Sequence, residues 1–259
     1  MKISVVINTY NSERYLEQCL DSVADFDQVV VCDMHSADRT LQIATAYGCK
    51  VVMHDHTGIV EPARNYAISQ ADNDWVLVVD SDEVVPATLR EALYQFVESC
   101  GNDSGGDDCA GLLIPRSNFF LGRFMHGSWP DYILRLVRKS RTDWPVTIHA
   151  RARVEGRVER LPPRRALSFT HLDNPTVRER VDKLNLYTEK ERAARAGKDY
   201  SLCAAWIKGS FRFVRMYFFK GGFRDGRPGY VYARLDAFYK MLTIFKLWED
   251  RLPGGQNQG

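Results

Sequence analysis

The sequence predicts an α/β protein with a mostly parallel sheet flanked by helices, followed by a helical C-terminal extension. Over the first hundred or so residues, apolar runs of strand length alternate with segments of helical period. Helices between successive strands require crossover connections, and therefore parallel neighbouring strands. From about residue 174 onward, long helical stretches replace this alternation.

Four strands and four helices are expected in alternation before residue 100. The strands are expected at 2–8, 28–33, 50–54 and from 75 onward. Ser12 is expected to cap the first helix, whose apolar face consists of Tyr15, Leu16, Cys19, Leu20 and Val23. The other helices are expected from about 38 to 48, at 62–71 and from Pro86 to about 99. The turn-rich stretch 102–108 then marks a boundary or a mobile segment.

The fourth strand carries the main chemical signal. WVLVVDSDEVV, residues 75–85, is an apolar run followed by Asp80, Ser81, Asp82 and Glu83. An unbroken apolar run is typical of a strand covered on both faces, and ligands of open α/β sheets bind at the carboxyl ends of the strands. These carboxylates are therefore placed for chemistry, although a solvated turn is the simpler interpretation.

Phosphates would have to be held without a glycine-rich loop. The sequence contains no GxGxxG after a strand and no GxxxxGK[ST]. A hard divalent cation is the alternative, because Mg²⁺ or Mn²⁺ takes a few carboxylate oxygens and keeps positions for phosphate oxygens. Asp80 and Asp82 could supply such oxygens, although a DxD pair alone is weak evidence.

Composition excludes several classes of protein. The chain has 259 residues, with 35 Lys and Arg against 33 Asp and Glu, so no global field attracts it to nucleic acid. The start, MKISVVINTYNSE, has too short an apolar stretch for a signal peptide, and no apolar run is long enough to span a membrane. Six cysteines without a CxxC pair argue against a zinc site or a disulfide framework. We therefore expect a cytoplasmic protein.

Four segments together resemble a known family. They are SVVINTYNSERYLEQCLDSV, VVVCDMHSADRT, ARNYAI and VLVVDSDE, in this order. The chain resembles, over about residues 2–100, the nucleotide-binding half of inverting family 2 glycosyltransferases with the Rossmann-like GT-A fold. HGSWPDYILRLVRKS and LSFTHL further resemble the branch that contains bacterial lipopolysaccharide core β-1,4-glucosyltransferases.

The resemblance implies a domain plan and a reaction. A GT-A catalytic domain would occupy 1–172, with 1–100 binding the nucleotide sugar and 101–172 facing the acceptor, and a helical region would occupy 173–259. The implied reaction moves a hexose from a nucleotide sugar to a saccharide or lipid-linked saccharide acceptor. A UDP-sugar is the expected donor. It would depend on Mn²⁺ or Mg²⁺ and serve lipopolysaccharide or other cell-envelope glycan synthesis.

The resemblance also implies a set of site residues. Those implied to bind the nucleotide sugar are Thr9, Tyr10, Asn11, Glu13, Asp33, Arg64, Asp80 and Ser81. Asp82 would be the principal metal ligand, with Asp80 and His149 as further ligands; His171 has weaker support. Each has a structural alternative, such as Tyr10 as a core ring or Asp33 as a helix cap. Met34, His35 and Ser36 depart from the family, many of whose members have a Gly-Ser pair after the second-strand aspartate.

Asp131 is the predicted catalytic base. An inverting displacement needs a group that takes the proton from the acceptor hydroxyl. Asp131 follows Trp129-Pro130, which suit a sugar-stacking turn, and precedes a strand whose Arg135 and Arg138 could face the phosphates. Glu83 is the rival base, although its position beside the metal should lower its pKa. A turn-capping role for Asp131 is the structural alternative.

The C-terminal region combines aromatic and basic residues. A helix is expected from Asn174-Pro175, as cap and first-turn proline, to about Gly197. Residues 206–248 then hold thirteen aromatic residues and nine Lys or Arg, opposed only by Asp225 and Asp236. This pattern suits a surface lying on an anionic membrane, although packing of two helices against the catalytic domain also explains it.

Two other functions compete with sugar transfer. VVDSDEV fits the pattern of haloacid-dehalogenase-like phosphatases, in which Asp80 would be the nucleophile. Such phosphatases carry this motif on an early strand, whereas three strand-helix units precede it here. The second alternative is a non-catalytic protein that binds nucleotide sugars.

Overall fold

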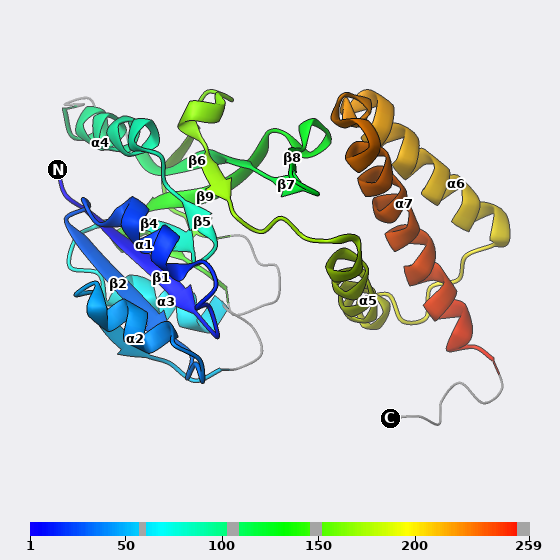
Figure 1. The fold of residues 1–259 in the computed structure, drawn as a ribbon, viewed down its shortest axis with the longest axis horizontal. Coiled ribbons are helices and arrows are strands. Elements are labelled where there is room, and N and C mark those ends of the chain that lie inside the picture. The colour runs from blue at the N-terminus through cyan, green and yellow to red at the C-terminus, as the bar shows by residue number, and fades with distance from the viewer. Residues whose placement is uncertain (57–60, 103–108, 146–151, 253–259) are drawn as a thin grey trace. The chain divides into compact units, whose positions relative to one another are not determined.

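The computed structural model describes residues 1–56, 61–102, 109–145 and 152–252. The chain divides into two compact units (Figure 1). Unit 1 consists of Met1–Ser117 and Pro130–Leu172, and unit 2 consists of Asn118–Trp129 and Asp173–Gly259. The predicted division into a catalytic domain at 1–172 and a helical region at 173–259 stays a prediction.

Unit 1 is built on a sheet with strand order β3-β2-β1-β4-β9-β6-β13-β5, in which β12 also pairs with β6. The first four strands in this order are parallel, and β9 runs antiparallel between β4 and β6. Their bounds are β1 Ile3–Thr9, β2 Gln28–Asp33, β3 Lys50–Met53, β4 Trp75–Asp80, β5 Glu83–Val84, β6 Cys109–Ser117, β9 Asp131–Arg138, β12 Arg157–Arg160 and β13 Phe169–His171. The predicted fold class and the four predicted strands are confirmed.

Helices cover both faces of this sheet (Figure 1). They are α1 Leu16–Val23, α2 Thr40–Ala46, α3 Glu61–Ser69 and α4 Ala87–Asn102. Ile3, Val5 and Ile7 of β1 belong to one core with the apolar sides of α1, α2 and α4. Val6 faces the opposite side, where a second core includes residues of α3. Burial on both faces explains why β1, β2 and β4 are nearly continuous apolar runs.

Short elements complete unit 1. They are β10 Thr142–Asp143, β11 Arg153–Val154, and the 3₁₀ turns η2 Lys139–Arg141 and η3 Arg165–Leu167. β10 and β11 form a separate two-stranded sheet. All six cysteines of the chain are free thiols, in line with the absence of a disulfide framework from the sequence.

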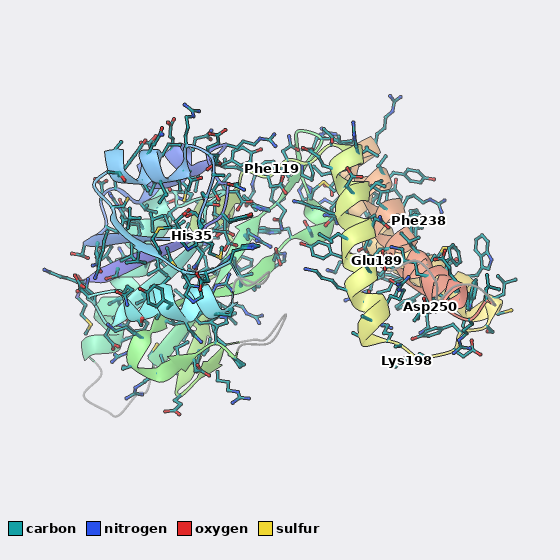
Figure 2. All side chains as sticks on the ribbon, turned by 90° about the horizontal axis from the view of Figure 1, so that it is seen from below. His35, Phe119, Glu189, Lys198, Phe238 and Asp250 are labelled. Carbon is teal, nitrogen blue, oxygen red and sulfur yellow. The ribbon has the colours of Figure 1, made fainter. Side chains whose placement is uncertain are left out.

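Unit 2 consists mainly of three helices, α5 Val177–Ala194, α6 Leu202–Val214 and α7 Gly226–Glu249. The remaining elements are the hairpin strands β7 Phe119–Phe120 and β8 Arg123–Phe124, the 3₁₀ turns η1 His126–Ser128 and η5 Gly222–Asp225, and the π-helical turn η4 Arg215–Phe219. Gly209 lets α6 approach α7, because a Cβ atom there would lie 2.7 Å from the Met241 side chain. Glu189 of α5, labelled in Figure 2, pairs with Lys246 of α7 at 2.6 Å. Among the described helices, none has the length and apolarity needed to cross a membrane.

Two predicted helix caps are wrong. α1 begins only at Leu16, and the Ser12 hydroxyl accepts a hydrogen bond from the Tyr10 amide instead, because residues 13–15 form a turn before the helix. α5 begins after Thr176, whose side chain and that of Glu179 form a reciprocal capping box. That box satisfies the first amides of α5 without Asn174, whose side chain accepts a hydrogen bond from the Gly122 amide.

Candidate active site

Three arginines and three carboxylates gather around the carboxyl end of β4. This charge cluster consists of Arg64, Asp80, Glu83, Arg116, Asp131 and Arg135. Asp80 ends β4, Arg135 and Asp131 lie on β9, and Arg116 lies near the end of β6. Because β9 is antiparallel to β6, its first residue, Asp131, pairs directly with Arg116. The sheet topology therefore brings together residues from four distant parts of the sequence.

Asp80 is held as an anion by arginines. Arg135 donates hydrogen bonds to both carboxylate oxygens of Asp80, and Arg64 Nη2 lies 3.6 Å from Oδ1. Burial alone would raise the pKa of Asp80, but Arg135, with Arg64 and Arg116, lowers the pKa to about 2. Arg64 also lies over the Trp144 ring at 5.7 Å. Asp80 therefore already carries strong cationic partners within the protein.

Glu83 is the most deeply buried acid of the charge cluster, with a fully buried side chain. Its Oε1 lies 3.3 Å from both Arg116 and Arg135, and its Oε2 accepts a hydrogen bond from the Asp80 amide. Burial raises the pKa of Glu83, and the charge of Asp80 raises it further, against the opposite effect of the arginines. Within the protein alone, burial outweighs the positive charge of the arginines, and the expected lowering by a bound metal stays a prediction. A group so enclosed is poorly placed to meet an acceptor hydroxyl.

Asp131 lies at a more accessible edge of the charge cluster. Its side chain is 34% exposed, whereas that of Glu83 is 0% exposed. Arg116 donates to Asp131 Oδ2 from Nε at 3.1 Å and from Nη2 at 2.8 Å. The same guanidinium reaches Glu83 through Nη1, so Arg116 links the predicted base to the buried acid.

The two arginines predicted to face the phosphates have different surroundings, since Arg135 lies within β9 and Arg138 ends it. Arg135 contacts Asp80 and Glu83, as described above. Arg138 pairs with Trp75 at the start of β4, where its guanidinium lies 5.0 Å from the ring centre and 4.0 Å from Asp74. The expectation for Arg138 is therefore wrong, because the antiparallel course of β9 carries it to the amino end of β4.

Asp82 faces a histidine rather than an arginine. The Nε2 atom of His171 lies 3.2 Å from Asp82 Oδ2. This contact arises because β13 pairs antiparallel with β5, with His171 opposite Glu83. A carboxylate oxygen and an imidazole nitrogen this close can both ligate one divalent cation, so the donor set fits Mn²⁺ or Mg²⁺ completed by water and phosphate. His149, the other predicted ligand, lies outside the described residues.

The ends of β1 and β2 are tied together by Asp33. Thr9 Oγ1 donates to Asp33 Oδ1 at 2.8 Å, and the Ser36 hydroxyl and amide donate to Oδ1 and Oδ2. The Asp33 side chain is fully buried. Both oxygens thus serve to fix the loop after β2, and a hydrogen bond to a nucleobase would have to be made in addition to these contacts.

Tyr10 presents an exposed ring at the same edge, stacked on His56 with 4.0 Å between ring centres. Close by in sequence, His35 Nε2 lies 3.5 Å from Asp55, and the His54 ring lies 5.3 Å from that of Tyr66. His35 adopts a φ of 61°, an uncommon conformation for a residue with a side chain. No role is predicted for these histidines from sequence, because nothing in their spacing marks them as neighbours of Tyr10.

The other predicted nucleotide contacts lie in loops at this edge. Asn11 Oδ1 accepts from the Ala37 amide, and Glu13 Oε2 accepts from Arg39. Ser81 donates to the Ser12 hydroxyl at 3.1 Å. These bonds link the loop after β1 to those after β2 and β4, which shapes the edge where a nucleotide is expected.

The sheet and its acidic edge define an α/β protein suited to a nucleotide and a cation. Residues 4–107 match the family described as "Glycosyl transferase family 2". The chain is 25% identical over 262 residues to the lipopolysaccharide core biosynthesis glycosyltransferase LpsC of Rhizobium meliloti, covering 96% of this chain and 93% of that protein. It is also 39% identical over 104 residues to the poly(ribitol-phosphate) beta-N-acetylglucosaminyltransferase TarS of Staphylococcus aureus, covering 36% of this chain and 18% of that protein.

The N-terminal part of the chain, residues 4–107, is therefore similar to glycosyl transferase family 2. The likeness to a lipopolysaccharide core glycosyltransferase extends along almost the whole chain, including the C-terminal region. A haloacid-dehalogenase-like phosphatase is disfavoured by the family match. It is also disfavoured by the arginines that neutralise Asp80, because a nucleophile held this way is poorly available.

Proposed function

We propose that the chain transfers a hexosyl group from a UDP-sugar to a saccharide or lipid-linked saccharide, with inversion at the anomeric carbon. The observation that carries this proposal is the pair of distinct acidic sites at one sheet edge. Asp82 lies against His171, and Asp131 lies against Arg116. The first pair suits a cation on the donor side, and the second suits a base on the acceptor side.

Asp82 and His171 would hold the divalent cation, Mn²⁺ or Mg²⁺. When bound, the cation neutralises negative charge on the departing diphosphate. Asp80 is a weaker candidate for a ligand than Asp82, because Arg135 and Arg64 already neutralise its carboxylate. We assign Asp80 instead to orienting Arg64 and Arg135 near the donor.

Asp131 would act as the general base. It accepts the proton of the acceptor hydroxyl while the acceptor oxygen bonds to the anomeric carbon. The bond from that carbon to the diphosphate oxygen breaks, and its electron pair leaves with the nucleoside diphosphate. Arg116 holds one carboxylate oxygen of Asp131 through two hydrogen bonds, which fixes the direction in which the base faces. Arg116 is thus a positioning residue.

The acceptor is proposed from the likeness to LpsC, a lipopolysaccharide core biosynthesis glycosyltransferase. We assign the reaction to the synthesis of lipopolysaccharide or another cell-envelope glycan, at the cytoplasmic face of the cell membrane. A lipid-linked acceptor would lie in that membrane, so an enzyme that associates with its surface meets the acceptor at high local concentration.

The donor can be tested by thermal unfolding of the protein with a panel of nucleotide sugars, each with and without Mn²⁺. A ligand that binds only the folded state raises the Tm, so a UDP-sugar should raise the Tm more with Mn²⁺ than without it. An equal shift from UDP-, GDP- and CMP-sugars would contradict the proposed donor. Release of nucleoside diphosphate during turnover then separates an enzyme from a protein that only binds nucleotide sugars.

A further inference from the structure

α6 and the following π-helical turn expose an unusual number of large apolar side chains. These side chains, called the α6 face, belong to Leu202, Trp206, Ile207, Phe211, Val214 and Phe218. Trp206 is 60% exposed, Ile207 67% and Phe211 64%. Ile207, Phe211, Val214 and Phe218 follow one another at steps of four, three and four residues, so they share one side of the helix. Single exposed apolar residues are ordinary, but a continuous exposed stripe marks an interaction surface.

The opposite side of α6 packs against α7 and carries small residues. Ala205 and Gly209 are buried there, and Gly209 contacts the Met241 side chain. The α6 face is therefore not the surface by which α6 joins unit 2. Most of the surface of Ile207 and Phe211 stays exposed, which leaves it for a partner.

The exposed charged residues between positions 202 and 230 are all positive. Lys208, Arg215, Lys220, Arg224 and Arg227 are all exposed. The two acids between residues 200 and 248, Asp225 and Asp236, are buried. Asp225 accepts hydrogen bonds from His126, and Asp236 pairs with Arg212. Pairing inside unit 2 thus removes both negative charges from this surface and leaves the basic residues to face a partner.

An apolar hollow of about 560 Å³ between α6 and α7 adjoins this face. Trp206 and Val214 belong to both, and Phe213, Phe238 and Met241 also line the hollow. Arg234 also lines it, with its guanidinium 4.3 Å from the Phe213 ring centre. An apolar hollow with an arginine matches an anionic lipid, whose chains are apolar and whose phosphate is negative.

We propose that the α6 face is the surface by which the protein lies on an anionic bilayer. Its apolar residues would enter the boundary between headgroups and acyl chains, and the basic residues would contact lipid phosphates. A second copy of the chain is a poorer occupant, because a twofold contact would set the same positive charges against one another. The inference rests on the proposed function only for the acceptor's place in a membrane, since binding to vesicles needs no turnover.

The test is sedimentation of the full-length protein with vesicles of phosphatidylcholine, with or without phosphatidylglycerol. Wild-type protein should bind the phosphatidylglycerol vesicles at low salt, bind them less at high salt, and bind neutral vesicles weakly. Ile207→Ser with Phe211→Ser should weaken binding at least tenfold. The matched control is Leu186→Ser with Tyr187→Ser, two exposed apolar residues of α5, and it should bind as wild type.

The basic residues have their own variant and control. Lys208→Gln with Arg215→Gln should weaken binding about fivefold for each charge removed. Lys190→Gln with Lys198→Gln removes two exposed charges elsewhere in unit 2, at α5 and just after it, and should weaken binding less; Lys198 is labelled in Figure 2. If the two pairs of substitutions weakened vesicle binding equally, the basic residues near α6 would have no special role in binding. Equal binding of the wild type to neutral and to anionic vesicles would have the same meaning.

Three outcomes would overturn the proposal itself. One is a folded wild-type protein that binds no vesicle at low salt. Another is unchanged binding of the Ile207 and Phe211 variant. The third is a dimer in light scattering that this variant dissociates, without vesicle binding, which would make the α6 face a contact between copies. Nucleoside diphosphate release with a water-soluble acceptor should be the same in wild type and variant, so failure of the membrane inference and failure of the proposed reaction are distinguishable.

Discussion

The charge cluster of unit 1 and the α6 face of unit 2 reverse the usual places of charged and apolar residues. In the charge cluster, Glu83 has no exposed side-chain surface and the Arg135 side chain is 7% exposed. In the α6 face, aromatic and aliphatic side chains lie outside, with Trp206 and Phe211 mostly in solvent. Arginines belong to the charge cluster and also occur between the residues of the α6 face, at Arg212 and Arg215, so arginine content alone does not distinguish the two regions. The burial and the pairing of the side chains distinguish the two regions.

Buried charges and exposed apolar side chains each have a free-energy cost, and we therefore interpret both regions as functional. Burying a charge costs several kcal/mol before pairing offsets it, and packed apolar residues in the same place are often as stable. Exposing large apolar side chains forgoes about 1.5–3 kcal/mol for each one that could have been buried. The two costs differ in kind, so the comparison predicts different responses to mutation in the two regions.

The largest effect is expected from the predicted base. Asp131→Asn should slow glycosyl transfer by roughly 10²–10⁴-fold, because the amide cannot take the proton of the acceptor hydroxyl. Affinity for the nucleotide sugar, measured by titration, should stay near that of wild type. Near-normal turnover would move the role of base to another residue.

A large loss of stability is expected from Arg135→Met. This change leaves Asp80 and Glu83 without their shared guanidinium, and breaking a buried pair in this way costs about 3–5 kcal/mol. Arg138→Met, on the same strand but outside the charge cluster, is the matched control and should cost about 1 kcal/mol or less. Denaturant unfolding measures the free energy of unfolding of both variants. Equal losses would show that burial of the charge cluster does not raise the cost of breaking its ion pairs.

Acid should weaken the charge cluster through Asp80. Its pKa is lowered to about 2 in the folded protein, so the folded state favours the ionised form. The stabilisation is fully present above the unfolded pKa of about 4 and is lost as the pH falls toward 2. The difference in free energy of unfolding between wild type and Asp80→Asn should therefore shrink below about pH 4. A difference that stays constant down to pH 2 would contradict the shifted pKa.

The smallest change in stability is expected in the α6 face. Phe211→Ser should alter the free energy of unfolding by no more than about 0.5 kcal/mol, because the side chain is already mostly in water. Thermal or denaturant unfolding tests this directly. A loss of several kcal/mol would mean that Phe211 packs within the protein, and would remove the contrast with Arg135.

The parts of the structure that could be predicted from the sequence are the elements that depend on a local pattern of apolar residues. The runs at 2–8, 28–33 and 75–80 became β1, β2 and β4 because burial on both faces leaves an unbroken apolar signature. Contacts between β4 and later strands could not be predicted, since periodicity says nothing about which strands pair. The antiparallel course of β9 separates Arg135 from Arg138, and the pairing of β13 with β5 brings His171 to Asp82.

The most direct measurement is release of nucleoside diphosphate from a UDP-sugar by wild type and Asp82→Ala, with Mn²⁺ and with excess chelator. If Asp82 and His171 hold the cation that serves the departing diphosphate, the wild type should be active only with metal, and Asp82→Ala should be inactive in both conditions. The Tm without metal should differ little between the two proteins, because Asp82 is partly exposed. Full activity of the wild type in excess chelator, or metal-dependent activity of Asp82→Ala equal to that of wild type, would contradict the account.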